Sequence, residues 1–269
     1  IRLFIHAFME PSLKIRPRYV PLYTPEGVDL AEENYHYLQL NWEIPRSRAA
    51  FVLLDCWANH FSRETLQRID SISREKIAPT LETCRRAGLT VIHAPGPLLA
   101  DRDPNRIRVL PEGASEQVPW PDSPEWPPAE FKRKSGPFTA YQRPYQKEAE
   151  ERNTWRLTRR KYHPALQPRE GEPVIAYGEE LHRYCAEKGI LFLFFVGFNT
   201  NVCLVGRDYG AYAMLKRGYE IIVLRDCTTG MEIAETTATL ACTRAQIATM
   251  EQLDVYTSTS AEFRDAVSD

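Results

Sequence analysis

The chain has 269 residues, 43% of them hydrophobic and 26% charged, with a formal net charge of −2; this length suits one large domain, and the charge excludes a general attraction to nucleic acid or anionic membranes. No apolar run reaches the about 18 residues that span a bilayer, and no secretory leader is visible. The six cysteines are scattered without a Cys-x-x-Cys pair, so we expect a cytoplasmic protein with reduced thiols.

The first part of the chain predicts an arm followed by a strand–helix–strand unit. Residues 1–48 are punctuated by proline and rich in aromatic side chains, and we assign them no chemistry. Residues 49–55 (AAFVLLD) form the first predicted core strand, which ends on Asp55. A helix is predicted over residues 64–87, and residues 89–94 (LTVIHA) form the second strand.

A long insertion, residues 95–170, separates the second strand from the third. More than half of the chain's 20 prolines lie between positions 95 and 144, and basic residues gather between 132 and 161. Connections of this length are functional or assembly elements. We expect the insertion, together with the N-terminal arm, to cover a sheet edge or a neighbouring subunit and to help close a pocket. A solvated helix is the alternative for the basic stretch.

Strands and helices alternate again after the insertion. The predicted strands lie at 171–177, 190–196, 219–225 and 254–257, and the predicted helices at 179–188 and 234–253. This alternation predicts an α/β, Rossmann-like three-layer fold: a six-stranded, mainly parallel sheet with helices on both faces. This domain would then cover residues 49–257, and residues 258–269 would form a C-terminal tail.

The strand at 190–196 leads directly to a cysteine. Its continuous apolar run indicates a strand buried on both faces, and Cys203 follows after a short turn. Helical spacing then predicts a helix from Cys203 to Gly218. The cysteine would therefore lie at the carboxyl edge of the sheet, where ligands bind, and a helix start would lower the pKa of its thiol. A small buried core cysteine is the alternative.

A family resemblance rests on the same stretch. Gly197-Phe-Asn-Thr-Asn-Val-Cys203, followed by Arg207-Asp208, Gly218-Tyr219 and Asp226, resembles the isochorismatase-like cysteine hydrolases. The likeness covers residues 49–94 and 171–257. The family includes isochorismatases and nicotinamidases, and the chain is similar to its ureidoacrylate and N-carbamoylsarcosine amidohydrolases.

The resemblance implies a cysteine nucleophile, Cys203, and an aspartate base. Asp55 matches the aspartate of the family's D-x-Q-x-x-F pattern, although Trp57 replaces the glutamine and Phe61 falls one residue late. A carboxylate that ends a core strand faces the ligand edge, whereas a capping aspartate is the alternative. We expect Trp57, His60 and Phe61 to line the substrate pocket.

The third catalytic group of the family is a lysine after the third strand, and here the sequence departs. Tyr177 occupies that position. Lys132 or Lys134, upstream in the insertion, would supply the charge, and Phe138 beside them and Tyr177 would join the pocket. Both lysines would otherwise be solvated surface residues.

The resemblance also implies an oxyanion hole formed by the backbone N–H groups of Asn199 and Cys203, after a cis peptide between Phe198 and Asn199. Family members that bind a metal carry an aspartate and histidines after the second strand, whereas this chain has His93-Ala-Pro-Gly-Pro. No glycine-rich nucleotide motif is present. We therefore expect no metal and no cofactor.

We expect a cysteine-dependent amidohydrolase that cleaves a C–N bond of a small amide or ureido compound through a thioester. The expected partner is the small-molecule substrate, with neither nucleic acid nor membrane, and the expected assembly is a homo-oligomer, a dimer or a tetramer. Two alternatives stay open: a vinyl-ether hydrolase of the isochorismatase type, and a catalytically silent family member with an assembly role.

Overall fold

The computed structural model describes residues 10–108, 126–144, 150–151, 154 and 158–268. The chain divides into two compact units, one formed by Ile1–Val109 with Arg160–Asp269 and the other by Leu110–Arg159. Part of the basic stretch predicted between positions 132 and 161, residues 145–149, 152–153 and 155–157, lies outside the described residues.

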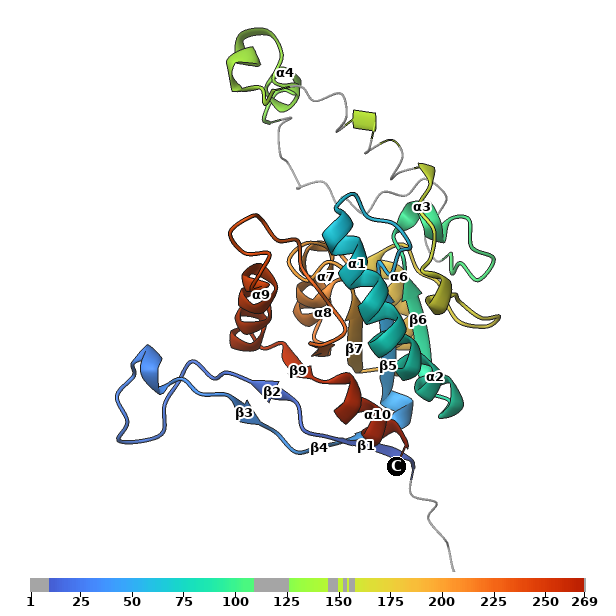
Figure 1. Ribbon diagram of the computed structural model, residues 1–269. Helices are drawn as coiled ribbons and strands as arrows, with labels where there is room; N and C mark the ends of the chain where they lie inside the picture. The colour runs from blue at the N-terminus through green and yellow to red at the C-terminus, as the bar shows by residue number, and fades with distance from the viewer. Residues whose placement is uncertain (1–9, 109–125, 145–149, 152–153, 155–157, 269) are drawn as a thin grey trace, which may run out of the picture. The chain divides into compact units, whose positions relative to one another are not determined.

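The first unit is built on a seven-stranded sheet with the order β3-β2-β9-β8-β7-β5-β6 (Figure 1). The five strands from β9 to β6 are parallel to one another. The predicted α/β class with a mainly parallel sheet is therefore confirmed. The parallel strands are β5 (Ala49–Leu54), β6 (Thr90–Ala94), β7 (Phe192–Gly197), β8 (Glu220–Leu224) and β9 (Tyr256–Ser258).

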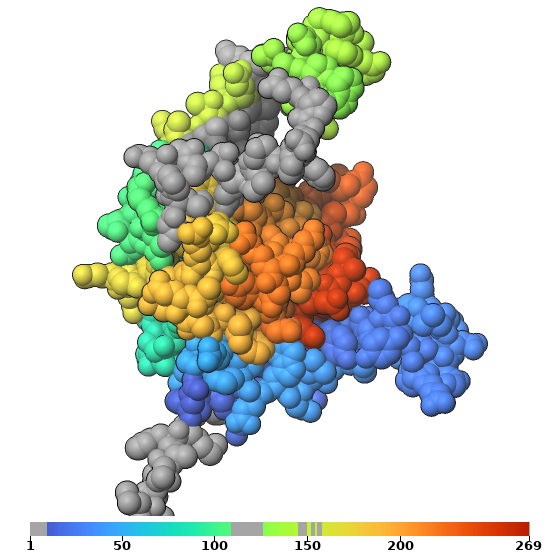
Figure 2. Space-filling model, turned by 180° about the vertical axis from the view of Figure 1, so that it is seen from behind, coloured from blue at the N-terminus to red at the C-terminus, as the bar shows by residue number. Residues whose placement is uncertain are grey.

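The N-terminal arm supplies the other two strands of this sheet. β2 (Arg18–Tyr19) pairs antiparallel with β9 and with β3 (Leu38–Gln39), while β1 (Ser12–Ile15) and β4 (Trp42–Pro45) form a separate antiparallel pair. Two short 3-10 helices, Glu32–Asn34 and Arg46–Arg48, complete the arm. Between positions 22 and 43 no side chain of the arm is buried, and the arm stands out from the rest of the first unit (Figure 2).

Helices cover both faces of the parallel sheet because its side chains alternate. Phe51 and Leu53 of β5 pack in one hydrophobic cluster, and Val52 and Leu54 in the other. The first cluster includes residues of α1, α2 and α10, and the second residues of α6, α8 and α9. These helices are α1 (Arg63–Ile72), α2 (Ala78–Arg86), α10 (Ser260–Ser268), α6 (Gly178–Lys188), α8 (Ala211–Lys216) and α9 (Ala241–Gln252).

The C-terminal segment is part of the core. Phe263 of α10 is fully buried, and its ring lies 5.7 Å from that of Phe51 and 4.5 Å from that of Phe194. Burial of one phenylalanine contributes about 1.5–3 kcal/mol to folding. The segment predicted as a tail therefore helps to hold the sheet.

Two predicted elements are interrupted. The long helix before β6 consists of α1, one π turn (Ser73–Ile77) and α2, and Pro79, which has no N–H to donate, lies just after the π turn within this continuous helix. The segment 171–177, all of it described, is not a strand: only Val174 bridges, to His93 and Arg106. Pro173 lies in this segment, and a proline cannot donate a ladder hydrogen bond.

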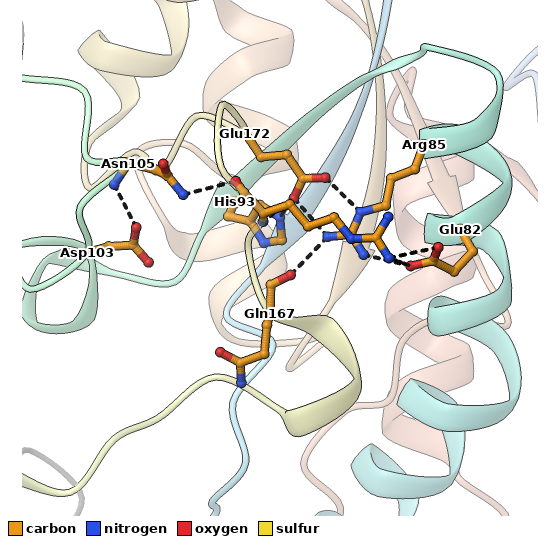
Figure 3. Close-up of polar contacts among 8 residues, drawn as sticks. Glu82, Arg85, His93, Asp103, Asn105, Gln167 and Glu172 are labelled. Atoms are coloured by element: carbon orange, nitrogen blue, oxygen red, sulfur yellow. Dashed lines mark hydrogen bonds and ion pairs between the residues drawn. The ribbon is translucent and has the colours of Figure 1, made fainter.

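An ion-pair network ties this segment to α2 and β6 (Figure 3). Glu172 accepts hydrogen bonds from Arg85 at 2.7 and 2.8 Å and contacts His93 Nε2 at 2.8 Å. Burial by itself raises the pKa of Glu172, but the hydrogen bonds from Arg85 and His93 outweigh it and lower the pKa to about 2. The network adds to the backbone hydrogen bonds of this segment, in which Pro173 O accepts from His93 N–H and Ile175 N–H donates to His93 O, both at 2.9 Å.

Two further short helices belong to the first unit: α3 (Pro97–Ala100) and the 3-10 helix Pro164–Leu166. The second unit contains α4 (Ala129–Arg133) and the 3-10 helix Gly136–Tyr141. The rings of Phe131 and Phe138 meet edge to face at 5.2 Å within it.

Candidate active site

Asp55 follows β5 directly and points its carboxylate into the protein. Its backbone adopts the left-handed region with φ of 49°, which aspartate tolerates better than most residues, and its N–H donates to Ala94 O at 2.9 Å. The residue is 1% exposed. The first and second strands thus jointly fix this carboxylate at the carboxyl edge of the sheet.

The end of β7 is held against the end of β5 by a close backbone approach. Gly197 has φ of 125°, and a Cβ there would lie 1.8 Å from Leu54 O, so only glycine fits. Phe198 N–H donates to the same oxygen at 3.1 Å, and the peptide between Phe198 and Asn199 is cis, as the resemblance implies. This approach brings the turn before Cys203 next to Asp55.

The helix predicted from Cys203 to Gly218 is wrong, because the chain leaves the helix after one turn. α7 covers only Cys203–Gly206, and Arg207 is extended with ψ of 151°. The chain folds back after α7 and brings Gly210 against it. A Cβ on Gly210 would lie 2.7 Å from Leu204 O, so a larger residue would not fit there. The interruption directs Arg207 toward the sheet edge.

Arg207 forms an ion pair with Asp55. Its Nε–H and Nη2–H donate to Asp55 Oδ2 at 2.9 and 2.8 Å, and the Tyr209 hydroxyl donates to Oδ1 at 3.3 Å. Gly96, with φ of 86°, leaves room for this pair: a Cβ there would lie 3.4 Å from both Arg207 Nη2 and Asp55 Oδ1. Sequence reasoning noted Arg207 only as part of a family pattern and missed this contact.

The Asp55 carboxylate and the Cys203 thiol interact, and this interaction lowers the pKa of Asp55 and raises that of Cys203. Burial raises the pKa of both groups. Burial and the Asp55 charge together raise the pKa of Cys203 to about 12, against the opposing effect of Arg207. The expectation that a helix start lowers the pKa of this thiol is therefore wrong.

Trp57 forms a wall beside the ion pair. It is 8% exposed, its Nε1–H donates to Pro95 O at 2.7 Å, and the Arg160 guanidinium carbon lies 3.4 Å from the centre of its ring. The Arg207 guanidinium carbon lies 6.0 Å from the same ring. Arg160 also opposes the rise in the pKa of Asp55. Arg160, in the last part of the insertion, therefore contributes to this wall.

A comparison with protein families decides the identity. The family model described as Isochorismatase domain matches residues 49–255, which include Asp55, Cys203 and Arg207. The chain belongs to the isochorismatase family.

Several solved structures are similar to the chain. A cysteine hydrolase from Pseudomonas syringae pv. phaseolicola is similar with a TM-score of 0.53 at 16% identity, over 84% of this chain and 95% of that chain. An isochorismatase from Pseudomonas putida has a TM-score of 0.48 at 16% identity, over 81% and 91%. A nicotinamidase from Staphylococcus aureus has a TM-score of 0.42 at 10% identity, over 78% and 99%. None of the curated proteins matches the chain.

The predicted oxyanion donors of this isochorismatase-family protein, Asn199 and Cys203, follow the end of β7, and Asn199 comes directly after the cis peptide. The backbone of Asn199 lowers the pKa of the Cys203 thiol. Within the described parts of the chain, neither the Asn199 nor the Cys203 backbone N–H donates to a backbone carbonyl. Thr229 O accepts from Thr200 N–H at 3.1 Å and from the Asn199 side chain at 3.4 Å, which holds the turn in place.

The other predicted pocket residues of this isochorismatase-family protein each have contacts of their own. His60 stacks on Phe61 at 4.4 Å and accepts from Ser62 N–H at 3.0 Å, and Phe61 is 44% exposed. Tyr177 caps α6 and packs against Val174. Among the described residues, no hydrogen bond links Tyr177 to Asp55 or Cys203.

Lys132, Lys134 and Phe138 belong to the second unit. Lys134 ends α4 with φ of 53°, and its Nζ lies 3.3 Å from the centre of the Phe131 ring. Lys132 lies in the last turn of α4. Their assignment to the site stays a prediction.

His93 is 2% exposed and is bound by Glu172 in the core of this isochorismatase-family protein. In the described ranges, no group of three or more His, Cys, Asp or Glu side chains is arranged to hold a metal ion. Over the same residues, every helix is too short or too polar to cross a membrane.

Proposed function

We propose that the protein is a cysteine-dependent hydrolase that cleaves a C–N bond in a small amide or ureido compound. The observation that carries this proposal is that the buried Asp55 carboxylate lies close enough to Cys203 for its charge to raise the pKa of the thiol. A thiol beside a carboxylate has a base for its proton.

The first half of the proposed reaction forms a thioester. Asp55 takes the thiol proton as Cys203 Sγ bonds to the substrate carbonyl carbon, and the carbonyl oxygen becomes an oxyanion bound by the N–H groups of Asn199 and Cys203. The oxyanion then collapses, the C–N bond breaks, and Asp55 returns the proton to the leaving nitrogen.

The second half hydrolyses the thioester. Asp55 takes a proton from water as the water oxygen attacks the thioester carbonyl, and the same N–H groups bind the second oxyanion. The C–S bond breaks, the acid leaves, and Asp55 returns the proton to the sulfur. These steps need no cofactor.

The test combines substrate screening with mass spectrometry of the intact protein. Amides, ureas and carbamoyl amino acids are offered, and a rapidly quenched reaction is searched for an acyl adduct on Cys203. Turnover with an adduct supports the proposal. Turnover by a Cys203→Ala variant would rule out thioester chemistry, and Cys242→Ala, the other partly exposed cysteine, is the matched control.

One observation favours a second candidate, a vinyl-ether hydrolase. Burial raises the pKa of Asp55, and a protonated carboxyl is the acid that vinyl-ether cleavage requires. In that reaction, release of a keto acid from an enol ether would occur without any adduct on Cys203, so the same mass spectrum separates the two candidates.

A further inference from the structure

We propose that Arg207 takes the part that the family resemblance assigns to a lysine, as the fixed positive charge that keeps Asp55 ionised and stabilises negative charge at Cys203. This inference rests on the proposed roles of Asp55 and Cys203. It makes Arg207 a further catalytic group, because its guanidinium touches the carboxylate that accepts the proton.

The first support is the contact itself. Two N–H groups of Arg207 reach a single oxygen of Asp55, whose side chain is fully buried, while the Arg207 side chain stays 30% exposed. A carboxylate loses most of its hydration at such a depth, so a charge in direct contact matters far more than at the surface. In the described parts of the chain, Asp55 forms an ion pair with Arg207 and with no lysine.

The second support is the packing of the loop that carries Arg207. Tyr177 stands where the family pattern has its lysine, and Gly178 follows it. Gly178 N–H donates to Asp208 Oδ2 at 2.6 Å, and a Cβ on Gly178 would lie 2.2 Å from Asp208 O. The segment that would have carried the lysine is therefore packed against the residue next to Arg207. The loop that carries Arg207 therefore contacts the segment that carries Tyr177, and it supplies a cation to Asp55.

The third support is the backbone that presents Arg207. The helix after Cys203 ends at Gly206, and Gly210 allows the chain to fold back against Leu204 O. An uninterrupted helix would place the fourth residue after the cysteine one turn above it, away from the carboxylate that follows β5. The break and the room beside Gly96 together allow the ion pair to form.

An arginine changes the chemistry in one respect. A lysine can exchange a proton near pH 10, whereas a guanidinium stays charged over the whole accessible range. The proton of the proposed reaction then moves only among Asp55, Cys203, the leaving nitrogen and water. Arg207 lowers the energy of the negative charge without carrying the proton.

The experiment measures the ionisation of Asp55 directly, so that it does not depend on a known substrate. The carboxyl carbon signal of Asp55 is followed by NMR over pH in protein labelled with carboxyl-¹³C aspartate, and it is assigned by its loss in Asp55→Asn. Arg207→Gln removes the charge but keeps a hydrogen-bond donor. Arg207→Lys keeps the charge. Arg217→Gln, which breaks a partly exposed ion pair with Glu179, is the matched control.

We expect the pKa of Asp55 to rise by at least about one unit in Arg207→Gln and to stay close to the native value in Arg207→Lys and Arg217→Gln. With a substrate, the acidic limb of kcat/KM moves to higher pH in Arg207→Gln alone. An unchanged Asp55 titration in folded Arg207→Gln overturns the inference. If Arg207→Gln does not fold, Arg207→Lys provides the test. A rise of about one unit or more in the pKa of Asp55 in Arg207→Lys then overturns the inference.

The lysines of the insertion provide an independent check. With Arg207 as the cation, Lys132→Ala and Lys134→Ala both keep most of the native turnover. Loss of most activity in one of these variants alone overturns the inference. If no compound is hydrolysed but the Asp55 titration responds to Arg207 as expected, the proposed function fails and the electrostatic role of Arg207 stands.

Discussion

Gly178 at the start of α6 donates its backbone N–H to the carboxylate of Asp208 at 2.6 Å, and this contact joins two loops that are 30 residues apart in the sequence. One loop carries Tyr177, and the other carries Arg207. The position of the Arg207 guanidinium on Asp55 therefore depends on a glycine that touches neither of them. Substitutions at contacts of this kind should change the site from a distance.

Gly178→Ala should impair the active site, although Gly178 is not part of that site. The added Cβ would lie 2.2 Å from Asp208 O, which is backbone and cannot turn away, so we expect a loss of about 1–3 kcal/mol in the free energy of unfolding. Turnover should fall at least about tenfold, since a shift of about 1 Å in a positioned group has this effect. Urea denaturation and steady-state kinetics measure the two effects.

Gly206→Ala is the control for that substitution. It lies in the same region, but a Cβ there meets nothing within 4 Å. Alanine also favours a helix over glycine, so stability should be equal or slightly higher. A Gly178→Ala protein as stable and as active as Gly206→Ala would contradict the close packing of Gly178 against Asp208.

Cys203→Ser should abolish turnover and leave the fold intact. The two side chains are nearly isosteric, but a serine hydroxyl is a far weaker nucleophile without a stronger base than Asp55. Circular dichroism and thermal denaturation should match the native protein, and Cys242→Ser should keep full activity. Hydrolysis of an amide substrate by Cys203→Ser at near-native rates would exclude Cys203 as the nucleophile.

Asp55→Asn should make Cys203 more reactive while turnover is lost. The charge of Asp55 is the second cause, after burial, that raises the pKa of Cys203 to about 12, and Arg207 opposes both. Removing that charge lowers the pKa, so the thiolate fraction at pH 8 increases. We expect Cys203 to be alkylated by iodoacetamide at least about tenfold faster than in the native protein.

Peptide mapping after limiting alkylation checks this, with Cys242 as an internal reference because it is also partly exposed. Slower labelling of Cys203 in Asp55→Asn, at an unchanged rate for Cys242, would show that Asp55 promotes the thiolate in the resting protein. That result would contradict an Asp55 charge that raises the pKa of the Cys203 thiol.

Glu172→Gln should destabilise the protein in a pH-dependent way. The pKa of Glu172 is lowered in the folded state to about 2, so its contribution is complete above the unfolded value of about 4.3 and is lost as pH falls toward 2. We expect the free energy of unfolding at pH 7 to drop by about 2–3 kcal/mol. The difference from the native protein should shrink between pH 4.5 and about pH 2.5.

Urea titrations at several pH values measure this difference. Glu187→Gln, which removes an exposed carboxylate that pairs with its neighbour Lys188, should change stability by less than about 0.5 kcal/mol at any pH. A pH-independent loss in Glu172→Gln would mean that packing of the side chain, and not its charge, holds the 171–177 segment.

The strand ends of the site could be predicted from the sequence because their signals are local. The apolar runs of β5 and β7 are continuous, each ends in a polar turn, and parallel strands bring their carboxyl ends to one edge. Asp55 and Cys203 were therefore expected at that edge, and in the structure the charge of Asp55 acts on the pKa of the Cys203 thiol. The cis peptide before Asn199 was expected from the resemblance alone.

The remaining features depend on contacts between residues that are distant in the sequence. Helical spacing continues past Cys203, but the close packing of Gly210 and the contact between Gly178 and Asp208 override it. The pattern at 171–177 predicts a strand, yet Val174 alone forms bridges there, one to His93 and one to Arg106. Local periodicity reflects the structural preference of a segment by itself. It does not include contacts with residues 30 or 150 positions away in the sequence.

The sequence by itself determined the α/β class, the two strand ends and the residues Asp55 and Cys203, because alternation and apolar runs are properties of neighbouring residues. Only the tertiary structure decided which cation meets the carboxylate. Arg207 is 152 positions from Asp55, and its reach depends on a helix break, two close glycine contacts and the burial that makes a single charge decisive.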